Sequence, residues 1–172
     1  MMYYSYCESP LGDILISCNE NSITGLWIRR PDNGLDSLHE KMVRMDSHPV
    51  LLKAARWVDD YFAGKKPDVS GLSLAPEGSG FRQLVWKLLL NIPYGEVVTY
   101  GSLAKEAARL MGKEKMSAQA IGGAVGNNPI SIIIPCHRVV GANKKLTGYG
   151  GGIHLKVMLL EHEGVDLTGY TE

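Results

Sequence analysis

A cysteine followed directly by a histidine is the feature of this sequence that could do chemistry. Cys136 and His137 come after an apolar run that ends in Pro135. A thiol at its ordinary pKa is mostly protonated at neutral pH, and only the thiolate is a strong nucleophile. A neighbouring histidine that is held in place by a third group can remove the thiol proton, directly or through a water molecule. The pair therefore predicts a nucleophilic cysteine with His137 as its base.

Glu163, late in the chain, is the candidate for the third group. It falls in the last turn of a predicted helix, where the carbonyl ends of the helix make a negative charge unfavourable. A residue placed against local preference often serves something other than the helix. The alternative is a solvated helix end, and the sequence alone favours neither. The Cys-His pair has an alternative of the same kind, a buried cysteine beside an exposed histidine.

The remaining cysteines, Cys7 and Cys18, lie in strand-like segments, and we expect them to be small core residues. An odd number of cysteines indicates at least one free thiol. The sequence has no Cys-x-x-Cys pair, and its five histidines show no metal-ligand spacing with the cysteines. We therefore predict no metal site.

The composition excludes some classes of function. Lys plus Arg and Asp plus Glu number 18 each, so the formal charge is zero and no global basic field argues for nucleic acid. No apolar run is long enough to span a membrane, and the tyrosine-rich start lacks the apolar centre of a signal peptide. We expect a cytoplasmic protein that does not enter a membrane.

The elements that position the candidate residues fall into two predicted domains, residues 1–76 and 77–172. Residues 67–80 contain two prolines and three glycines, a composition typical of a boundary. The first domain is predicted to be α/β, with a small antiparallel sheet that begins with a hairpin. Its strands are expected at 3–7, 13–18, 23–29 and 70–75, and its helices at 35–45 and 48–62.

The second domain is predicted to be mostly α. Its helices are expected at 81–89, 99–110, 117–126 and 153–163. Thr99 and Ser117 are suitable N-caps for the second and third of these helices. Two short helices joined by a polar turn resemble a helix-turn-helix, although the turn at 111–116 is longer than usual for that motif.

The third of these helices contains two adjacent glycines, Gly122 and Gly123. Glycine inside a helix costs roughly 1 kcal/mol relative to alanine, which indicates that something approaches the backbone closely. The approaching group could be another helix of the core or a nucleic-acid backbone. A helix of small residues with the polar Gln119 near its start would fit a narrow groove.

The stretch Pro135-Cys136-His137-Arg138-Val139 resembles the active-site signature of the O6-alkylguanine-DNA alkyltransferases, also called methylated-DNA–protein-cysteine methyltransferases. Residues 92–100 resemble the segment that leads into the helix-turn-helix of that family. Asn128 and Pro129 resemble its hinge, residues 149–152 its lid over the base pocket, and residues 159–164 the helix that carries its catalytic glutamate.

The resemblance covers about residues 80–165 with the order of the motifs preserved, whereas residues 1–75 resemble the variable N-terminal α/β domain of the family only loosely. It implies irreversible transfer of an alkyl group to Cys136 from O6-alkylguanine in DNA, and from O4-alkylthymine. The implied partner is double-stranded DNA that contains the lesion. The implied mechanism requires no cofactor or metal, and a monomer suits it because one molecule repairs one lesion. The DNA-binding helix would enter the minor groove, and the damaged nucleotide would be rotated out into the protein.

The resemblance also implies a role for each matching residue. Cys136 would be the alkyl acceptor, His137 the water-mediated base, and Glu163 the group that polarises it. Tyr100 would donate a proton or hydrogen bond to the departing guanine and help to displace the phosphate, and Asn128 would brace the hinge. The residues implied to contact DNA or the flipped base are Ser117, Ala118, Gln119, Gly122, Arg138, Val139, Tyr149 and Gly150.

Two positions depart from the pattern of the family. Gln119 stands where many members carry an arginine, and because it lacks a charge we expect weaker or less salt-sensitive DNA binding. Gly150 stands where the lid often has a serine, so a backbone amide remains but a hydroxyl is missing. Because of this difference, the sequence does not determine how large an alkyl group the pocket accepts.

Three other functions are alternatives to alkyl transfer. A lesion sensor without transfer chemistry would lack the acceptor, which Cys136 supplies. A transcriptional regulator that senses alkylation would need a metal-binding cysteine cluster or an effector domain, and the sequence shows neither. A cysteine hydrolase would rarely have Cys and His adjacent in sequence, and no oxyanion motif is evident.

Overall fold

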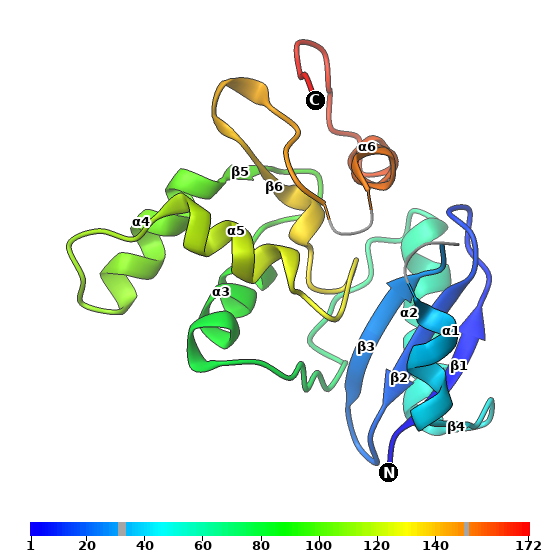
Figure 1. Cartoon of the computed structure of the whole chain (residues 1–172). Coiled ribbons are helices and arrows are strands. Elements are labelled where there is room, and N and C mark those ends of the chain that lie inside the picture. The colour runs from blue at the N-terminus through cyan, green and yellow to red at the C-terminus, as the bar shows by residue number, and fades with distance from the viewer. Residues whose placement is uncertain (31–33, 150–151) are drawn as a thin grey trace. The chain divides into compact units, whose positions relative to one another are not determined.

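The structure is a computed structural model that describes residues 1–30, 34–149 and 152–172. The chain forms two compact units (Figure 1). The first unit comprises Met1–Glu77 together with Pro129–Ser131, and the second comprises Gly78–Asn128 together with Ile132–Glu172.

The first unit contains a four-stranded sheet. Its strands are β1 (Tyr3–Cys7), β2 (Ile14–Cys18), β3 (Ile23–Ile28) and β4 (Val43–Arg44), in the order β3-β2-β1-β4. β1, β2 and β3 are antiparallel, which confirms the predicted hairpin, while β4 joins β1 in parallel, so the sheet is mixed. Every residue of β2 is buried, because this strand lies between two neighbours and under a helix.

Two predictions for the first unit are corrected. The segment 35–45, expected to be one helix, contains α1 (Leu35–Leu38), the 3-10 turn η1 (His39–Lys41) and then β4. The backbone here pairs with the edge of β1 instead, since the amide of Val43 donates to the carbonyl of Met2 at 2.9 Å. The segment 70–75 is not a strand, because it meets the sheet only at the bridge between Leu74 and Ile23.

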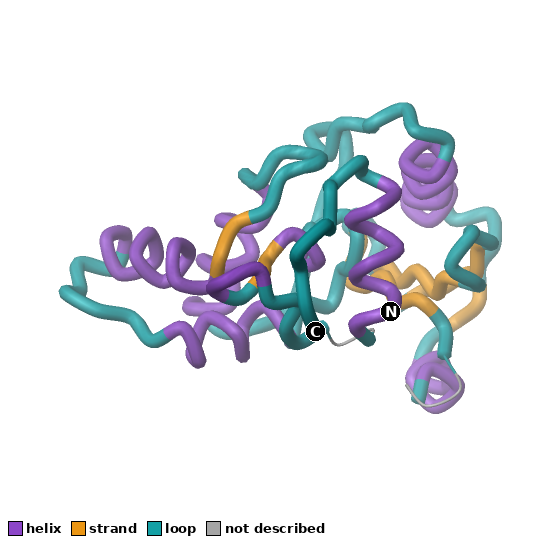
Figure 2. The backbone as a smooth tube through the Cα atoms, turned by 90° about the horizontal axis from the view of Figure 1, so that it is seen from above, coloured by secondary structure: helices purple, strands orange, loops and turns teal. Residues whose placement is uncertain are grey.

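The predicted helix that follows is confirmed as α2 (Pro49–Phe62). His48 caps its start by accepting from the amide of Val50, and Gly64 ends it with φ of +79°. The helix packs on the sheet through a buried face of Leu51, Ala54, Trp57, Val58 and Tyr61. α1 lies on the opposite face of the sheet (Figures 1 and 2).

The second unit is mostly helical, as predicted. Its helices are α3 (Gly80–Leu90), α4 (Tyr100–Leu110), α5 (Ala118–Gly126) and α6 (Ile153–His162). The first three of these pack together, and the indole of Trp86 on α3 donates to the carbonyl of Ala124 on α5 at 2.9 Å. Both predicted caps are confirmed: Thr99 accepts from the amide of Ser102, and Ser117 from the amide of Ala120, each at 3.0 Å.

A pair of two-residue strands brings distant parts of this unit together. β5 (Val98–Thr99) runs parallel to β6 (Val139–Val140), and Figure 2 shows them as short orange segments among the purple helices. β5 leads directly into α4, while β6 follows the 3-10 turn η2 (Cys136–Arg138). The start of α4 and the Cys-His segment are therefore held near each other. A further 3-10 turn, η3 (Ala142–Lys144), follows β6.

No helix in the described ranges is long and apolar enough to cross a membrane.

Candidate active site

His137 and Glu163, both singled out in the sequence, belong to a buried network of charged side chains. His137 is fully buried in η2, and its Nε2 lies 2.6 Å from Oε2 of Glu163. Arg138, the next residue, donates from Nε to Oε1 of Glu163 at 2.8 Å and from Nη2 to Oε2 at 3.0 Å. Glu163 itself is only 6% exposed. The alternatives of a solvated helix end and of an exposed histidine are thus excluded.

The loop before β5 supplies a fourth donor to this carboxylate. The amide of Gly95 donates to Oε1 of Glu163 at 3.1 Å. Gly95 has φ of +79°, and a Cβ atom at this position would lie 3.0 Å from the carbonyl oxygen of Glu163. A side chain is therefore excluded here both by the backbone conformation and by the close contact. The requirement explains why a glycine stands in the segment 92–100.

The hydrogen bonds of Glu163 determine the protonation of the imidazole. An ionised carboxylate can only accept, so Nε2 of His137 carries the proton and Nδ1 holds the lone pair. Among the described residues no group hydrogen-bonds to this buried Nδ1. Burial lowers the pKa of His137 from its ordinary 6.5, and the charge of Arg138 acts in the same direction against the raising effect of Glu163. His137 is consequently a neutral imidazole at neutral pH, with one nitrogen ready to accept a proton.

Cys136 lies in the same turn and is 6% exposed. Burial raises the pKa of its thiol, while a hydrogen bond from Asn128, the charge of Lys156 and the nearby Tyr149 side chain act to lower it. The side chain of Asn128 also donates to the carbonyl of Ile134 at 2.8 Å, which ties the segment that precedes Cys136 to the end of α5. The resting cysteine is therefore a protonated thiol in a setting that favours its anion at the moment of reaction.

Lys156 is a member of the site that the sequence reasoning missed. It lies on α6 and is fully buried, and its Nζ donates to the carbonyl of Thr147 at 2.8 Å. Burial lowers its pKa from 10.5 to about 8. The signal was present in the sequence, because Lys156, Leu159, Leu160 and Glu163 follow helical spacing and place two charged residues on one apolar stripe. A lysine on such a stripe is an exception that calls for a partner.

A second cysteine-histidine contact lies in the first unit. Sγ of Cys18 is 3.6 Å from Nδ1 of His48, and both side chains are buried. That nitrogen already accepts from the amide of Val50, so the histidine serves as a helix cap. Burial raises the pKa of the Cys18 thiol to about 11, and does the same for Cys7. Both cysteines stand in strands, as expected of structural residues.

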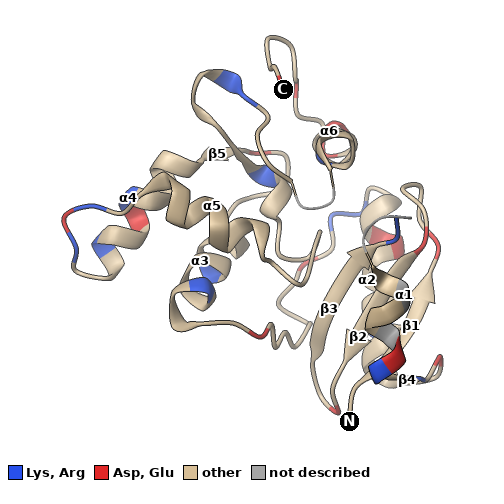
Figure 3. Cartoon of the chain, in the orientation of Figure 1, with Lys and Arg blue, Asp and Glu red and all other residues tan. Residues whose placement is uncertain are grey.

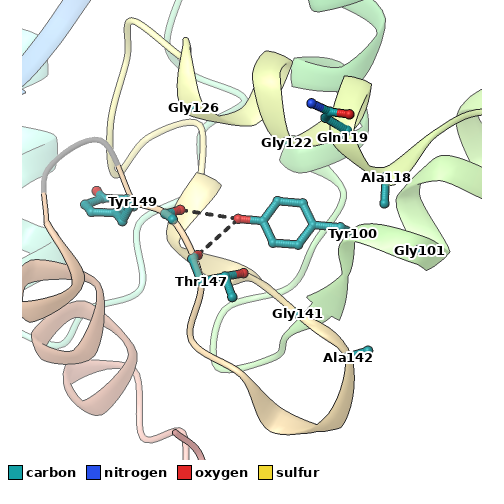
Figure 4. Close-up of a pocket in the computed structure, with 11 residues that line it drawn as sticks. Tyr100, Gly101, Ala118, Gln119, Gly122, Gly126, Gly141, Ala142, Thr147 and Tyr149 are labelled. Carbon is teal, nitrogen blue, oxygen red and sulfur yellow. Dashed lines mark hydrogen bonds between the residues drawn. The ribbon is translucent and has the colours of Figure 1, made fainter. Parts of the chain in front are cut away.

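A pocket of about 780 Å³ opens between the start of α4, α5 and the segment after η3 (Figure 4). Tyr100 projects across it, and its hydroxyl donates to the carbonyl oxygens of Thr147 and Gly148 at 3.2 and 3.3 Å. Tyr149, whose side chain acts to lower the pKa of the Cys136 thiol, is also in its lining. The pocket therefore adjoins the nucleophile.

The predicted DNA-binding helix, α5, faces the same pocket. Ala118, Gln119 and Gly122 are in its lining, and the exposed Ser117 caps the helix next to them. A Cβ atom on Gly122 would come no closer than 4.0 Å to the ring of Tyr100, and one on Gly123 would meet nothing within 4 Å. Close packing of another helix does not explain these glycines, so their backbone stays open to a molecule from outside.

Two predicted contact residues take other positions. Arg138 is 8% exposed and its guanidinium is bound to Glu163 and to the carbonyl of Ile92, so its assignment to DNA contact is corrected. Val139 is fully buried in β6 and is not in the lining of the pocket described above. Gly150 lies outside the described residues. In the described ranges, no group of three or more His, Cys, Asp and Glu side chains is arranged to hold a metal ion.

Comparison with known proteins gives matches for both parts of the chain. Residues 80–165 match the DNA binding domain of 6-O-methylguanine DNA methyltransferase, and residues 2–76 match its ribonuclease-like domain. A methylated-DNA–protein-cysteine methyltransferase of Haemophilus influenzae is 40% identical over 164 residues, which span 95% of this chain and 87% of that protein. One of Methanosarcina barkeri is 42% identical over 94% of this chain and 97% of its own.

Solved structures agree with the sequence matches. The crystal structure of an O6-methylguanine methyltransferase of Mycobacterium tuberculosis superposes with a TM-score of 0.82 at 38% identity and covers 98% of both chains. A structure of Mycobacterium tuberculosis OGT in complex with DNA gives a TM-score of 0.79 at 37% identity, covering 94% of this chain and 92% of that one. This chain belongs to the 6-O-methylguanine DNA methyltransferase family.

Proposed function

We propose that this protein repairs DNA by transferring an alkyl group from O6 of guanine, and from O4 of alkylthymine, to Sγ of Cys136. The observation that carries the proposal is the Glu163–His137 contact of 2.6 Å beside the buried Cys136. It fixes the proton of the imidazole on Nε2 and leaves Nδ1 as the base. A nucleophile, a neutral base and an orienting carboxylate are the parts that transfer of an alkyl group to sulfur requires.

The reaction moves one proton and one alkyl group. The thiol proton of Cys136 passes to Nδ1 of His137, directly or through one bridging water molecule. Sulfur forms a bond to the alkyl carbon while the bond from that carbon to guanine O6 breaks. The departing guanine takes up a proton, for which the hydroxyl of Tyr100 is the donor that faces the pocket. Neither a histidine nor a carboxylate hydrolyses the thioether that results, so each molecule repairs one lesion.

The surrounding charges support this sequence of steps. The imidazolium formed on His137 is stabilised by Glu163, whose own charge Arg138 holds in place. The charge of Lys156 favours the Cys136 thiolate. All of these groups are buried, where electrostatic interactions are stronger than in water. The network therefore lowers the free-energy cost of forming the Cys136 thiolate at the place where sulfur attacks the alkyl group.

Recognition of DNA is assigned to residues 77–172. The pocket lined by Tyr100, Gln119 and Tyr149 would hold the damaged nucleotide after it leaves the duplex, since the O6 atom cannot be reached by a buried side chain while the base is stacked. α5 would lie in the minor groove with Gln119 at the vacated position. We further propose that the protein works as a monomer in the cytoplasm.

Intact-mass spectrometry tests the proposal. The protein is incubated with a short duplex containing one O6-methylguanine, and the expected product carries one added methyl that maps to Cys136. Cys136→Ala should gain no mass, whereas Cys18→Ala, which removes the other cysteine in contact with a histidine, should react fully. An unchanged mass together with retained binding to the lesion would replace transfer with lesion sensing.

A further inference from the structure

We propose that the long turn between α4 and α5 is a second contact with DNA, in which Lys113 and Lys115 hold backbone phosphates beside the lesion. The inference rests on the proposed function and concerns a part of the chain that the transfer chemistry does not use. The turn is also where this sequence is longer than a helix-turn-helix requires.

A groove of about 520 Å³ lies under this turn, between α4 and the start of α5. Four cationic side chains and one carboxylate line it: Lys105, Arg109, Lys113, Lys115 and Glu114. The groove therefore has an excess of positive charge in a chain whose formal net charge is zero. Figure 3 shows these cations as a cluster of blue along the end of α4 and the turn.

Most of this charge is available to a ligand. Arg109 donates from Nε to Glu106 at 3.1 Å, so its charge is partly neutralised within α4. No carboxylate in the described ranges forms an ion pair with Lys105, Lys113 or Lys115. All three are exposed, and Lys113 and Lys115 lie in the turn between the two helices. An anion with several oxygen acceptors is the chemistry that such a group of ammonium ions binds.

The groove is continuous with the pocket for the damaged base. Gly101 and Ala118 line both, so the two hollows share a wall formed by the starts of α4 and α5. A nucleotide that enters the pocket past Gln119 remains linked to its strand. The phosphates that flank it must run over the surface next to the pocket. The basic groove lies on that surface, which favours the DNA backbone over an unrelated anion as its occupant.

The contact also offsets the missing charge at position 119. Phosphate contacts supply most of the salt-dependent affinity of proteins for DNA, and they carry no sequence information. Gln119 contributes no charge, whereas Lys113 and Lys115 add two cations within the same helix-turn-helix. The protein can therefore bind a duplex firmly before the damaged base is engaged.

The test compares how salt weakens binding in matched variants. The affinity for a short duplex, with and without one O6-methylguanine, is measured by fluorescence anisotropy as salt rises from about 50 to 200 mM. Each phosphate contact changes the slope of log K against log salt by about 0.9, so Lys113→Ala/Lys115→Ala should lower it by about 1.8. Over this fourfold rise, wild type should lose about 12-fold more affinity than the variant, on both duplexes.

A control variant separates local contact from total charge. Lys53→Ala/Lys87→Ala removes the same charge from exposed positions on α2 and α3 and should keep the wild-type slope. A slope that Lys113→Ala/Lys115→Ala leaves unchanged, or that both double variants lower equally, overturns the inference. Transfer of methyl to Cys136 from saturating duplex should proceed in all three proteins. Its absence in wild type would overturn the proposed function instead, so the two failures are distinguishable.

Discussion

Replacing Arg138 with leucine should destabilise the fold strongly and move the pH dependence of alkyl transfer. In the structure this guanidinium makes two hydrogen bonds to Glu163, at 2.8 and 3.0 Å, and a third to the carbonyl of Ile92 at 2.7 Å. Without it, Glu163, which is 6% exposed, loses the cation that pairs with its carboxylate, while its contacts with His137 and the amide of Gly95 remain. Removing one partner of a buried ion pair costs about 3–5 kcal/mol, whereas an exposed arginine that only contacted DNA would change the stability by about 0.5 kcal/mol or less.

Urea denaturation measures this cost. Arg138→Leu should lose about 3–5 kcal/mol of unfolding free energy, and a double variant that also carries Glu163→Leu should be less destabilised than the single one, because no unpaired charge is left buried. The charge of Arg138 lowers the pKa of His137. Its loss should therefore raise that pKa, so that the transfer rate of the variant falls with acid at a higher pH than in wild type. A loss of unfolding free energy below about 1 kcal/mol, together with a shallower salt dependence of DNA binding, would refute the buried network. Arg138 would then be a residue that contacts DNA.

The buried site and the adjoining pocket give four further predictions. Burial holds the pKa of His137 below 6.5, so single-turnover transfer should stay level through neutral pH and decline only as pH falls below that value; a rate that already falls above pH 6.5 would contradict this. Because the unfolded chain binds this proton more readily than the folded one, stability should also fall as pH drops below 6.5. A pKa of about 8 in place of 10.5 penalises the charged form of Lys156 by roughly 3 kcal/mol, so Lys156→Met should raise the unfolding free energy, by up to that amount, and slow transfer. Equal or lower stability in urea would refute the penalty. Gln119→Arg should tighten duplex binding and steepen its salt dependence by up to about 0.9, and if both stay unchanged, Gln119 is not in the DNA interface.

Local signals in the sequence were sufficient for the helices around the site. Thr99 and Ser117 cap α4 and α5 as predicted. A hydroxyl just before an apolar helical stripe is favoured there because it accepts a hydrogen bond from an amide of the first turn. Cys136 and His137 were recognisable since they are adjacent, and Glu163 because it stands against the preference of its helix end. In these places a short stretch of sequence contains the interaction that decides the structure.

Where prediction failed, the deciding partner lies far along the chain. Arg138 was assigned to DNA contact on the resemblance to the family, but its partner is Glu163, 25 residues away. Segment 70–75 alternates like a strand, yet the sheet offers it only the single bridge at Ile23. Such contacts depend on how the helices and strands pack together. Neither the hydrophobic periodicity of a segment nor its secondary-structure propensity contains that information.

The stoichiometry of transfer tests the central claim most directly. A known amount of protein is mixed with an excess of duplex carrying O6-methylguanine with a labelled methyl group, and label bound to protein and bases released from DNA are followed to completion. Direct transfer predicts a plateau at one methyl per chain, all of it on Cys136, with guanine left intact in the strand. Turnover beyond one methyl per chain, or release of the damaged base, would contradict direct transfer to the protein.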